Sequence, residues 1–128
     1  MQINHILLID DDDAVGLIIT AVLSKTNIVK KFKFSSSGPD ALEFLKQSEE
    51  QNDFPEAVFV DLNMPEMDGY EFILIYESLY FEKYPLTKVI VVTSSSRVKD
   101  QEMALNFKSV KKFINKPLNA EKILSVMQ

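Results

Sequence analysis

Short apolar runs separated by mixed polar segments are the most regular feature of the sequence. Four of these runs are continuous, at positions 6–9, 57–60, 89–92 and, more weakly, 113–114. Runs of this length, rich in β-branched residues, are typical of strands that are buried on both faces of a sheet. A fifth run, 29–34, reads VKKFKF, and its lysines do not suit a buried strand. We therefore predict four buried strands and one edge strand.

Segments with helical character lie between and after these runs. Five helices are predicted, at 15–22, around 41–45, at 70–81, 97–107 and about 119–128. In the first helix, apolar residues repeat at the i, i+3, i+4 and i+7 spacing of a single apolar face, and they are Val15, Ile18, Ile19 and Val22. A serine at position 95 or 96 is predicted to cap the fourth helix at its N-terminus.

The predicted order is a strand followed by a helix, repeated five times. Right-handed crossovers between parallel strands place helices on both faces of the sheet. The sequence shows no internal repeat, no low-complexity segment and no linker. We therefore predict a single α/β domain over residues 1–128, with a five-stranded parallel sheet covered by helices on both faces.

Composition and charge exclude several classes of protein. Apolar residues make up 46% of the chain and charged residues 26%, which is the balance of a globular domain rather than a disordered one. The net charge of −5 argues against a surface that binds nucleic acid. The chain has no cysteine, so a thiolate metal site and a disulfide are both excluded. No apolar stretch suits a membrane span or a signal peptide, so we expect a cytoplasmic protein.

Candidate chemistry lies where the predicted strands end. Asp10 and Asp11 follow the first run, Asp61 the third, Thr93 the fourth, and Lys116 the last. Ligands of open α/β sheets bind at this edge, so we expect these side chains to share one rim. Two carboxylates about 4 Å apart repel by about 4 kcal/mol at an effective dielectric constant of 20. Such a cluster calls for a cation, and its oxygen ligands suit Mg²⁺.

The same set of side chains suits phosphoryl transfer. This reaction depends on positioning and on neutralising the charge of the phosphoryl oxygens, with little covalent chemistry from the protein. A carboxylate on the rim is a plausible nucleophile and would form an acyl phosphate. Lys116 would supply a second positive charge beside the metal, and the Thr93 hydroxyl would donate a hydrogen bond to a phosphoryl oxygen.

Four segments carry a resemblance to a known family. In order, they are LLIDDDD, VFVDLNMPEMDG, VIVVTS and FINKP. Their order and spacing resemble the signature segments of response-regulator receiver domains, and the resemblance covers essentially the whole chain. It implies a flavodoxin-like, doubly wound (βα)5 fold with strand order 2-1-3-4-5.

The resemblance also implies a role for each residue. Asp61 would accept the phosphoryl group, with Thr93 and Lys116 in the roles given above. Asp11 would bind Mg²⁺ directly, Asp10 would act mainly through water, and Asp61 and the backbone carbonyl of Asn63 would complete the protein ligands. The Lys116–Pro117 peptide bond is predicted to be cis, as is common in the family.

The function that the resemblance implies is that of a switch in a two-component phosphorelay. The phosphoryl group would come from a histidine kinase or a histidine phosphotransfer protein. Thr93 would then move toward it, Phe113 would turn inward, and the face formed by the fourth helix, fifth strand and fifth helix would change its affinity for a downstream protein. We expect a receiver without an output domain, whose effect would have to go through another protein. A phosphorelay carrier or a phosphate sink is an equally open alternative to the output switch. We expect a monomer or a weak phosphorylation-dependent dimer that catalyses only its own phosphorylation and dephosphorylation.

Other interpretations of the same residues are less satisfactory. An aspartate after a strand is often a helix cap, and this interpretation suits Asp12 and Asp13, which we leave out of the site. A haloacid-dehalogenase-like phosphatase needs a second aspartate where this chain has Asn63. An EF-hand beginning at Asp10 would need its loop glycine at Val15. His5 lies far from the predicted rim and is expected to be structural or exposed.

Overall fold

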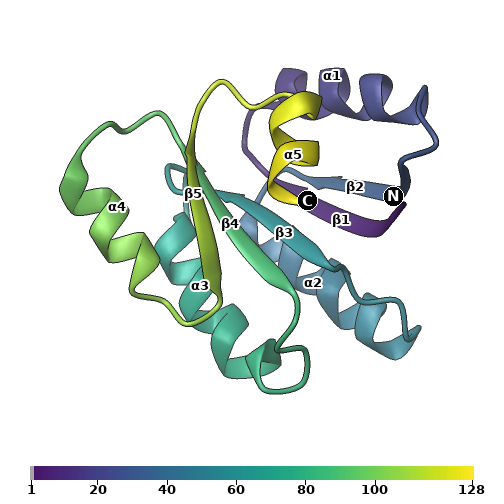
Figure 1. Cartoon of the computed structure of the whole chain (residues 1–128). Coiled ribbons are helices and arrows are strands. Elements are labelled where there is room, and N and C mark those ends of the chain that lie inside the picture. Colours follow the sequence, from purple (N-terminus) through teal and green to yellow (C-terminus); the bar gives the residue numbers. More distant parts are fainter. Residues whose placement is uncertain (1) are drawn as a thin grey trace.

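The computed structural model describes residues 2–128 as alternating strands and helices. In chain order, they are β1 (Ile3–Ile9), α1 (Asp13–Ser24), β2 (Val29–Ser35), α2 (Gly38–Glu50), β3 (Ala57–Asp61), α3 (Gly69–Tyr76), the π-helical turn η1 (Glu77–Phe81), β4 (Lys88–Thr93), α4 (Val98–Leu105), β5 (Val110–Asn115) and α5 (Ala120–Val126). The strands form one parallel sheet in the order β2-β1-β3-β4-β5 (Figure 1). The predicted flavodoxin-like α/β fold and its strand order are confirmed.

Both faces of the sheet are covered, so the core has two halves. Because successive side chains of a strand point to opposite faces, Leu7 and Ile9 of β1 pack with α2 and α3, while Ile6 and Leu8 pack with α1 and α5. Figure 1 shows α1 and α5 on one side of the sheet and α2, α3 and α4 on the other. All five residues of β3 are buried, as the continuous apolar run predicts.

The lysine-bearing strand lies at the edge of the sheet, as predicted. β2 pairs only with β1 among the described strands, and its three lysines are exposed. β5 forms the opposite edge of the sheet, and Phe113 and Ile114, predicted to lie in a buried strand, are only half-buried. Lys111 and Lys112, which precede them, are exposed. No helix within residues 2–128 has both the length and the apolar character needed to cross a membrane.

Helix α1 is confirmed, but its apolar face was predicted only in part, because Ile19 is buried and Val15 packs against the core while Val22 is exposed. The residues that face the sheet are Gly16, Ile19 and Leu23, whereas Ile18 is 63% exposed. The helix sits directly on the ring of Phe34, because a β-carbon at position 16 would lie 2.5 Å from that ring. Apolar residues occur on nearly every side of α1, so the i, i+3 spacing fits more than one face. An apolar stripe therefore remains in solvent.

The two predicted caps gave different results. Asp12 caps α1, accepting hydrogen bonds from the backbone nitrogens of Ala14 at 3.0 Å and Val15 at 3.4 Å. Helix α4 begins after Arg97 without a side-chain cap. The predicted serine cap is therefore wrong, and the Ser95 hydroxyl donates to the side chain of Asp100 instead, at 2.6 Å.

His5 is buried within β1 at the end of the sheet away from the predicted rim. Its Nδ1 lies 3.0 Å from the carbonyl oxygen of Asp53, its Nε2 is buried without a partner, and its ring meets Phe44 edge to face. Burial is the largest cause that lowers the pKa of His5, and the neighbouring Asp53 opposes it only in part. The predicted structural role is therefore confirmed.

The buried His5 should make the fold sensitive to mild acid. Because its folded-state pKa is lowered, its stabilising contribution is present above the unfolded pKa of about 6.5 and is lost as the pH falls below that value. The loss can reach about 1.4 kcal/mol per pH unit. Urea unfolding at about pH 7.5 and about pH 5.5 measures it, and His5→Gln should remove most of the pH slope. Equal slopes in the two proteins would contradict this account.

Candidate functional site

The carboxyl ends of β1 and β3 bring three carboxylates together. Asp10 and Asp11 follow the last residue of β1, and Asp61 ends β3. One oxygen of each side chain lies within 4.8 Å of the others. Asp10 and Asp61 are 1% and 2% exposed, whereas Asp11 is exposed. The three predicted acids therefore form one cluster with an open side.

Backbone amides hold one oxygen of each buried carboxylate. Asp10 Oδ1 accepts a hydrogen bond from the backbone nitrogen of Asp12 at 2.9 Å, and Asp61 Oδ1 accepts from that of Asn63 at 3.2 Å. Asp10 Oδ2 is buried and accepts no well-aligned hydrogen bond, and its one described partner is the ammonium of Lys116, at 3.2 Å. A buried carboxylate oxygen is costly unless it is paired, so positive charge at this position is stabilising.

Lys116 brings its ammonium into the acidic cluster from the end of β5. Its Nζ lies 3.0 Å from Asp61 Oδ2 and 3.2 Å from Asp10 Oδ2. The Lys116 backbone nitrogen donates to the Thr93 carbonyl at 2.8 Å, and the Lys116–Pro117 bond is cis, as predicted. Burial alone would lower the pKa of Lys116, but the contacts with Asp61 and Asp10 outweigh it and raise that pKa. The ammonium therefore stays charged at neutral pH.

The charges of the cluster favour a divalent cation. Burial raises the pKa of Asp61, and the hydrogen bonds from Lys116 and Asn63 only partly offset this effect. Three carboxylates face one ammonium, which leaves a formal charge of −2. Oxygen ligands of this kind, open to water on the Asp11 side, suit Mg²⁺. The predicted ligands Asp10, Asp11 and Asp61 thus fit the metal.

Thr93 completes the predicted set. Its side chain is fully buried at the end of β4, and its Oγ1 accepts a hydrogen bond from the backbone nitrogen of Ser95 at 3.1 Å. Among the described hydrogen bonds, none uses the Thr93 hydroxyl as a donor, so its proton is free for another oxygen. Thr93 and Asn63 also line a cleft of about 350 Å³ that runs from the rim toward α3 and α4.

Glycine at position 69 lets α3 begin in close contact with the end of β3. A β-carbon there would lie 2.6 Å from the carbonyl oxygen of Asp61 and 2.7 Å from the Cα of Leu62. Asp68 caps α3 by accepting from the backbone nitrogen of Glu71 at 2.9 Å. The Asp68–Gly69 pair therefore starts a helix beside the site.

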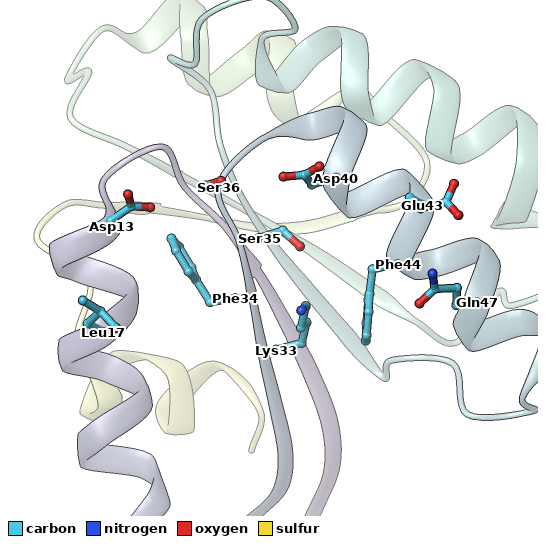
Figure 2. A pocket seen from close by; sticks show the side chains of 10 residues that line it. All are labelled: Asp13, Leu17, Lys33, Phe34, Ser35, Ser36, Asp40, Glu43, Phe44 and Gln47. Atoms are coloured by element: carbon cyan, nitrogen blue, oxygen red, sulfur yellow. The ribbon is translucent and has the colours of Figure 1, made fainter.

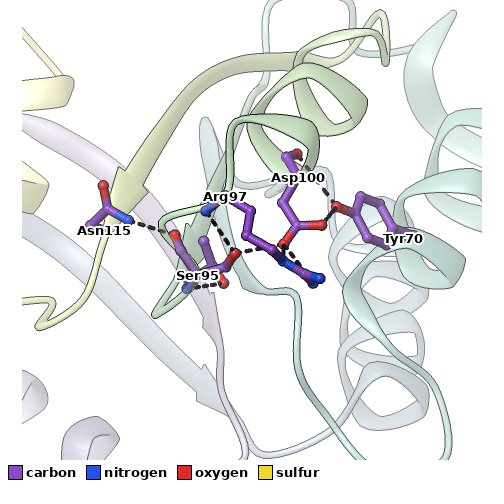
Figure 3. Close-up of polar contacts among 6 residues, drawn as sticks. Tyr70, Ser95, Arg97, Asp100 and Asn115 are labelled. Carbon is purple, nitrogen blue, oxygen red and sulfur yellow. Dashed lines mark hydrogen bonds and ion pairs between the residues drawn. The ribbon is translucent and has the colours of Figure 1, made fainter.

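A polar network next to Thr93 was not predicted. It joins five side chains from α3, the loop after β4, α4 and β5, shown in Figure 3, and they are Tyr70, Ser95, Arg97, Asp100 and Asn115. Their sequence positions carry no signal, because contacts between separate loops and helices have no periodicity.

A second cleft lies away from the acidic cluster. It has a volume of about 590 Å³ and is bounded by α1, β2 and α2 (Figure 2). Phe34 and Phe44 form its apolar walls, and Asp13, Asp40 and Glu43 give it an acidic border. None of the acidic-cluster residues, Thr93 or Lys116 lines this cleft, so it is not the site of the predicted chemistry.

The chain is similar to known proteins over nearly its whole length. The family model of the response regulator receiver domain matches residues 6–128. The chemotaxis protein CheY of Listeria monocytogenes is 32% identical over 106 residues, which cover 80% of this chain and 82% of that protein. The sensor histidine kinase CheAY of Helicobacter pylori is 29% identical over 123 residues, 96% of this chain. The matched region is only 14% of that kinase.

A solved structure shares the whole fold. The two-component response regulator from Cytophaga hutchinsonii is 28% identical and superimposes with a TM-score of 0.88. The match covers 99% of this chain and 96% of the other.

Proposed function

Because the chain belongs to the response regulator receiver family, we propose that Asp61 accepts a phosphoryl group from a phosphohistidine of a histidine kinase or phosphotransfer protein. An oxygen of the Asp61 carboxylate forms a bond to phosphorus while the donor's nitrogen–phosphorus bond breaks, and the donor keeps that electron pair. The observation that carries the proposal is the position of Asp61, whose carboxylate is buried beside Lys116 and within the acidic cluster.

The surrounding residues have separate tasks in this transfer. Lys116 already contacts an Asp61 oxygen at 3.0 Å and would neutralise charge on a phosphoryl oxygen bound there. The unused proton of the Thr93 hydroxyl would be donated to a second oxygen. Mg²⁺, held by Asp10, Asp11, Asp61 and the Asn63 carbonyl, would neutralise the cluster and draw the phosphoryl oxygens to it. We propose that this chemistry acts only on Asp61 of the protein itself and on no separate substrate.

The exposed face of α1 is suited to the phosphodonor protein. Leu17 is 70% exposed and Ile18 63%, and the helix carries no charged residue after Asp13. This face begins directly after Asp10 and Asp11, so a protein helix packed on it would lie beside the acceptor. Leu17 also lines the cleft of Figure 2, which extends the apolar surface toward α2. We infer that the donor docks here.

The output is proposed to be a change on the face formed by α4, β5 and α5. Phe113 of β5 is half-buried and packs against the core, where an inward turn would alter this face. A carrier would pass the phosphoryl group on to another protein, and a phosphate sink would lose it to water as inorganic phosphate, in both cases without such a change. The structural response therefore separates the two alternatives.

Nuclear magnetic resonance tests the switch. We expect Mg²⁺ with beryllofluoride, a mimic of the phosphoryl group, to shift the amide signals of the acidic cluster and also those of α4, β5 and α5. Shifts confined to the rim would refute the output switch and favour a carrier. The same experiment on Asp61→Asn provides the control, because beryllofluoride added at constant Mg²⁺ should cause no further shift when the acceptor carboxylate is missing.

A further inference from the structure

The carboxylate of Asp100, in the first turn of α4, is the centre of the network in Figure 3. Its Oδ2 accepts a 2.6 Å hydrogen bond from the Ser95 hydroxyl and is 3.2 Å from Arg97 Nε. The Tyr70 hydroxyl, from α3, lies 3.4 Å from both the Oδ1 and the backbone carbonyl oxygen of Asp100. One carboxylate thus ties α4 to α3 and to the loop that follows β4.

Ser95 connects this carboxylate to the acceptor site. Its backbone nitrogen donates to Thr93 Oγ1 at 3.1 Å, and its carbonyl oxygen accepts from Asn115 Nδ2, at the end of β5, at 2.8 Å. Its hydroxyl donates to Asp100. Ser95 is therefore bonded at once to the proposed phosphoryl ligand Thr93, to β5 and to α4.

These contacts occur while Asp61 is a free carboxylate whose Oδ2 is paired with Lys116. Ser95 is two residues from Thr93 and hydrogen-bonded to it, so a movement of Thr93 toward a phosphoryl group on Asp61 carries Ser95 along. We expect this movement to lengthen or break the short bond between Ser95 and Asp100. That bond would then oppose the movement, and its loss would release α4.

The common role of an acid in a first helical turn does not explain this arrangement. Asp100 does stand where a carboxylate favours the helix dipole. That role requires no contact with Ser95 or Tyr70, and yet the Ser95 hydrogen bond is the largest cause that lowers the pKa of Asp100. The Arg97 side chain is 80% exposed, so its ion pair with Asp100 contributes little.

We propose that Asp100 is a positioning residue that holds Ser95, and through it Thr93, in the arrangement of the unphosphorylated site and so couples the position of α4 to the state of Asp61. This inference rests on the proposed function. The acceptor site would then be coupled to α4 and α3 through a side chain that does not touch the phosphoryl group.

Removing this hold should tighten binding of the phosphoryl mimic. By linkage, a contact present only in the unphosphorylated arrangement weakens binding of any ligand that favours the other arrangement. Titration with beryllofluoride at saturating Mg²⁺ should give an affinity about fivefold or more higher for Asp100→Ala than for the parent protein. Ser95→Ala should give the same change and provides a second variant if Asp100→Ala folds poorly.

Three further comparisons separate positioning from a general structural effect. The double variant should bind no more tightly than either single variant, because both remove the same hydrogen bond. Arg97→Ala should bind as the parent does, since Ser95 keeps its bond to Asp100. The α4 amide signals of Asp100→Ala should already lie near their mimic-bound positions and shift little on titration, whereas those of the acidic cluster should still shift.

The outcomes are distinct. Tighter binding by both single variants, without additivity, supports the inference. Unchanged or weaker binding by Ser95→Ala and Asp100→Ala, or additive effects of the two, overturns it while leaving the proposed function intact. If the parent protein itself does not bind the mimic, the proposed function fails, and this inference fails with it.

Discussion

Replacing Lys116 with methionine should slow phosphorylation of Asp61 by about 100-fold or more. The ammonium lies 3.0 Å from Asp61 Oδ2 and 3.2 Å from Asp10 Oδ2, and it is the described cation nearest to the acceptor oxygen. Methionine keeps the length and apolar stem of the side chain but removes the charge. Phosphoryl oxygens would then meet the carboxylates with one positive charge fewer. The time course of phosphoryl uptake from acetyl phosphate with Mg²⁺, followed by intact-protein mass, measures the rate.

The matched control is Lys112→Met, four residues earlier on β5. Lys112 is exposed and makes no ion pair within the described residues, so this variant should react at the parent rate. Because the contacts with Asp61 and Asp10 raise the pKa of Lys116, the parent rate should also be insensitive to the lysine's titration up to about pH 9. Equal rates for Lys116→Met and Lys112→Met would show that the ammonium plays no part in the transfer.

The second large effect is expected at Asp11. Asp11→Asn should weaken Mg²⁺ binding by at least about tenfold, because it removes one of three clustered carboxylates and the only one that is exposed. The exposure of Asp11 also means that the substitution leaves the core intact. Calorimetric titration with Mg²⁺ gives the affinity directly, and phosphorylation should require correspondingly more Mg²⁺ and cease with a chelator.

Asp13→Asn is the control for charge alone. Asp13 is also exposed, in the first turn of α1, but it lies outside the carboxylate cluster. Its loss changes the net charge equally without removing a ligand. If Asp11→Asn and Asp13→Asn bind Mg²⁺ with the same affinity, the assignment of the metal to the Asp10, Asp11 and Asp61 cluster is wrong.

The rim residues could be predicted from the sequence for a topological reason. Parallel strands all end at the same edge of a sheet, so the residues after four apolar runs had to be neighbours once the runs were recognised as strands. Asp10, Asp61, Thr93 and Lys116 needed no further information, because each directly follows or ends its strand. The cis peptide bond between Lys116 and Pro117 was predicted from the family resemblance.

Features that depend on packing between separate elements could not be predicted in this way. The buried face of α1 is set by the contact of Gly16 with Phe34, and a helix that is apolar on most sides gives no preferred face. The Ser95 hydroxyl was assigned to a helix cap because that is its usual local use. A capping serine accepts hydrogen bonds from backbone nitrogens of its helix, whereas the Ser95 hydroxyl donates its proton to the side chain of Asp100, a contact that only the three-dimensional structure reveals.

The central claim is that Asp61 is the phosphoryl acceptor, and intact-protein mass tests it most directly. The parent protein, incubated with Mg²⁺ and acetyl phosphate, should gain the mass of a single phosphoryl group, and Asp61→Asn should gain none. The variant should remain folded and at least as stable, because burial raises the pKa of Asp61 and a neutral amide avoids the cost of burying that charge. An unchanged parent mass under conditions that modify another receiver domain, or an equal gain in Asp61→Asn, would contradict the account.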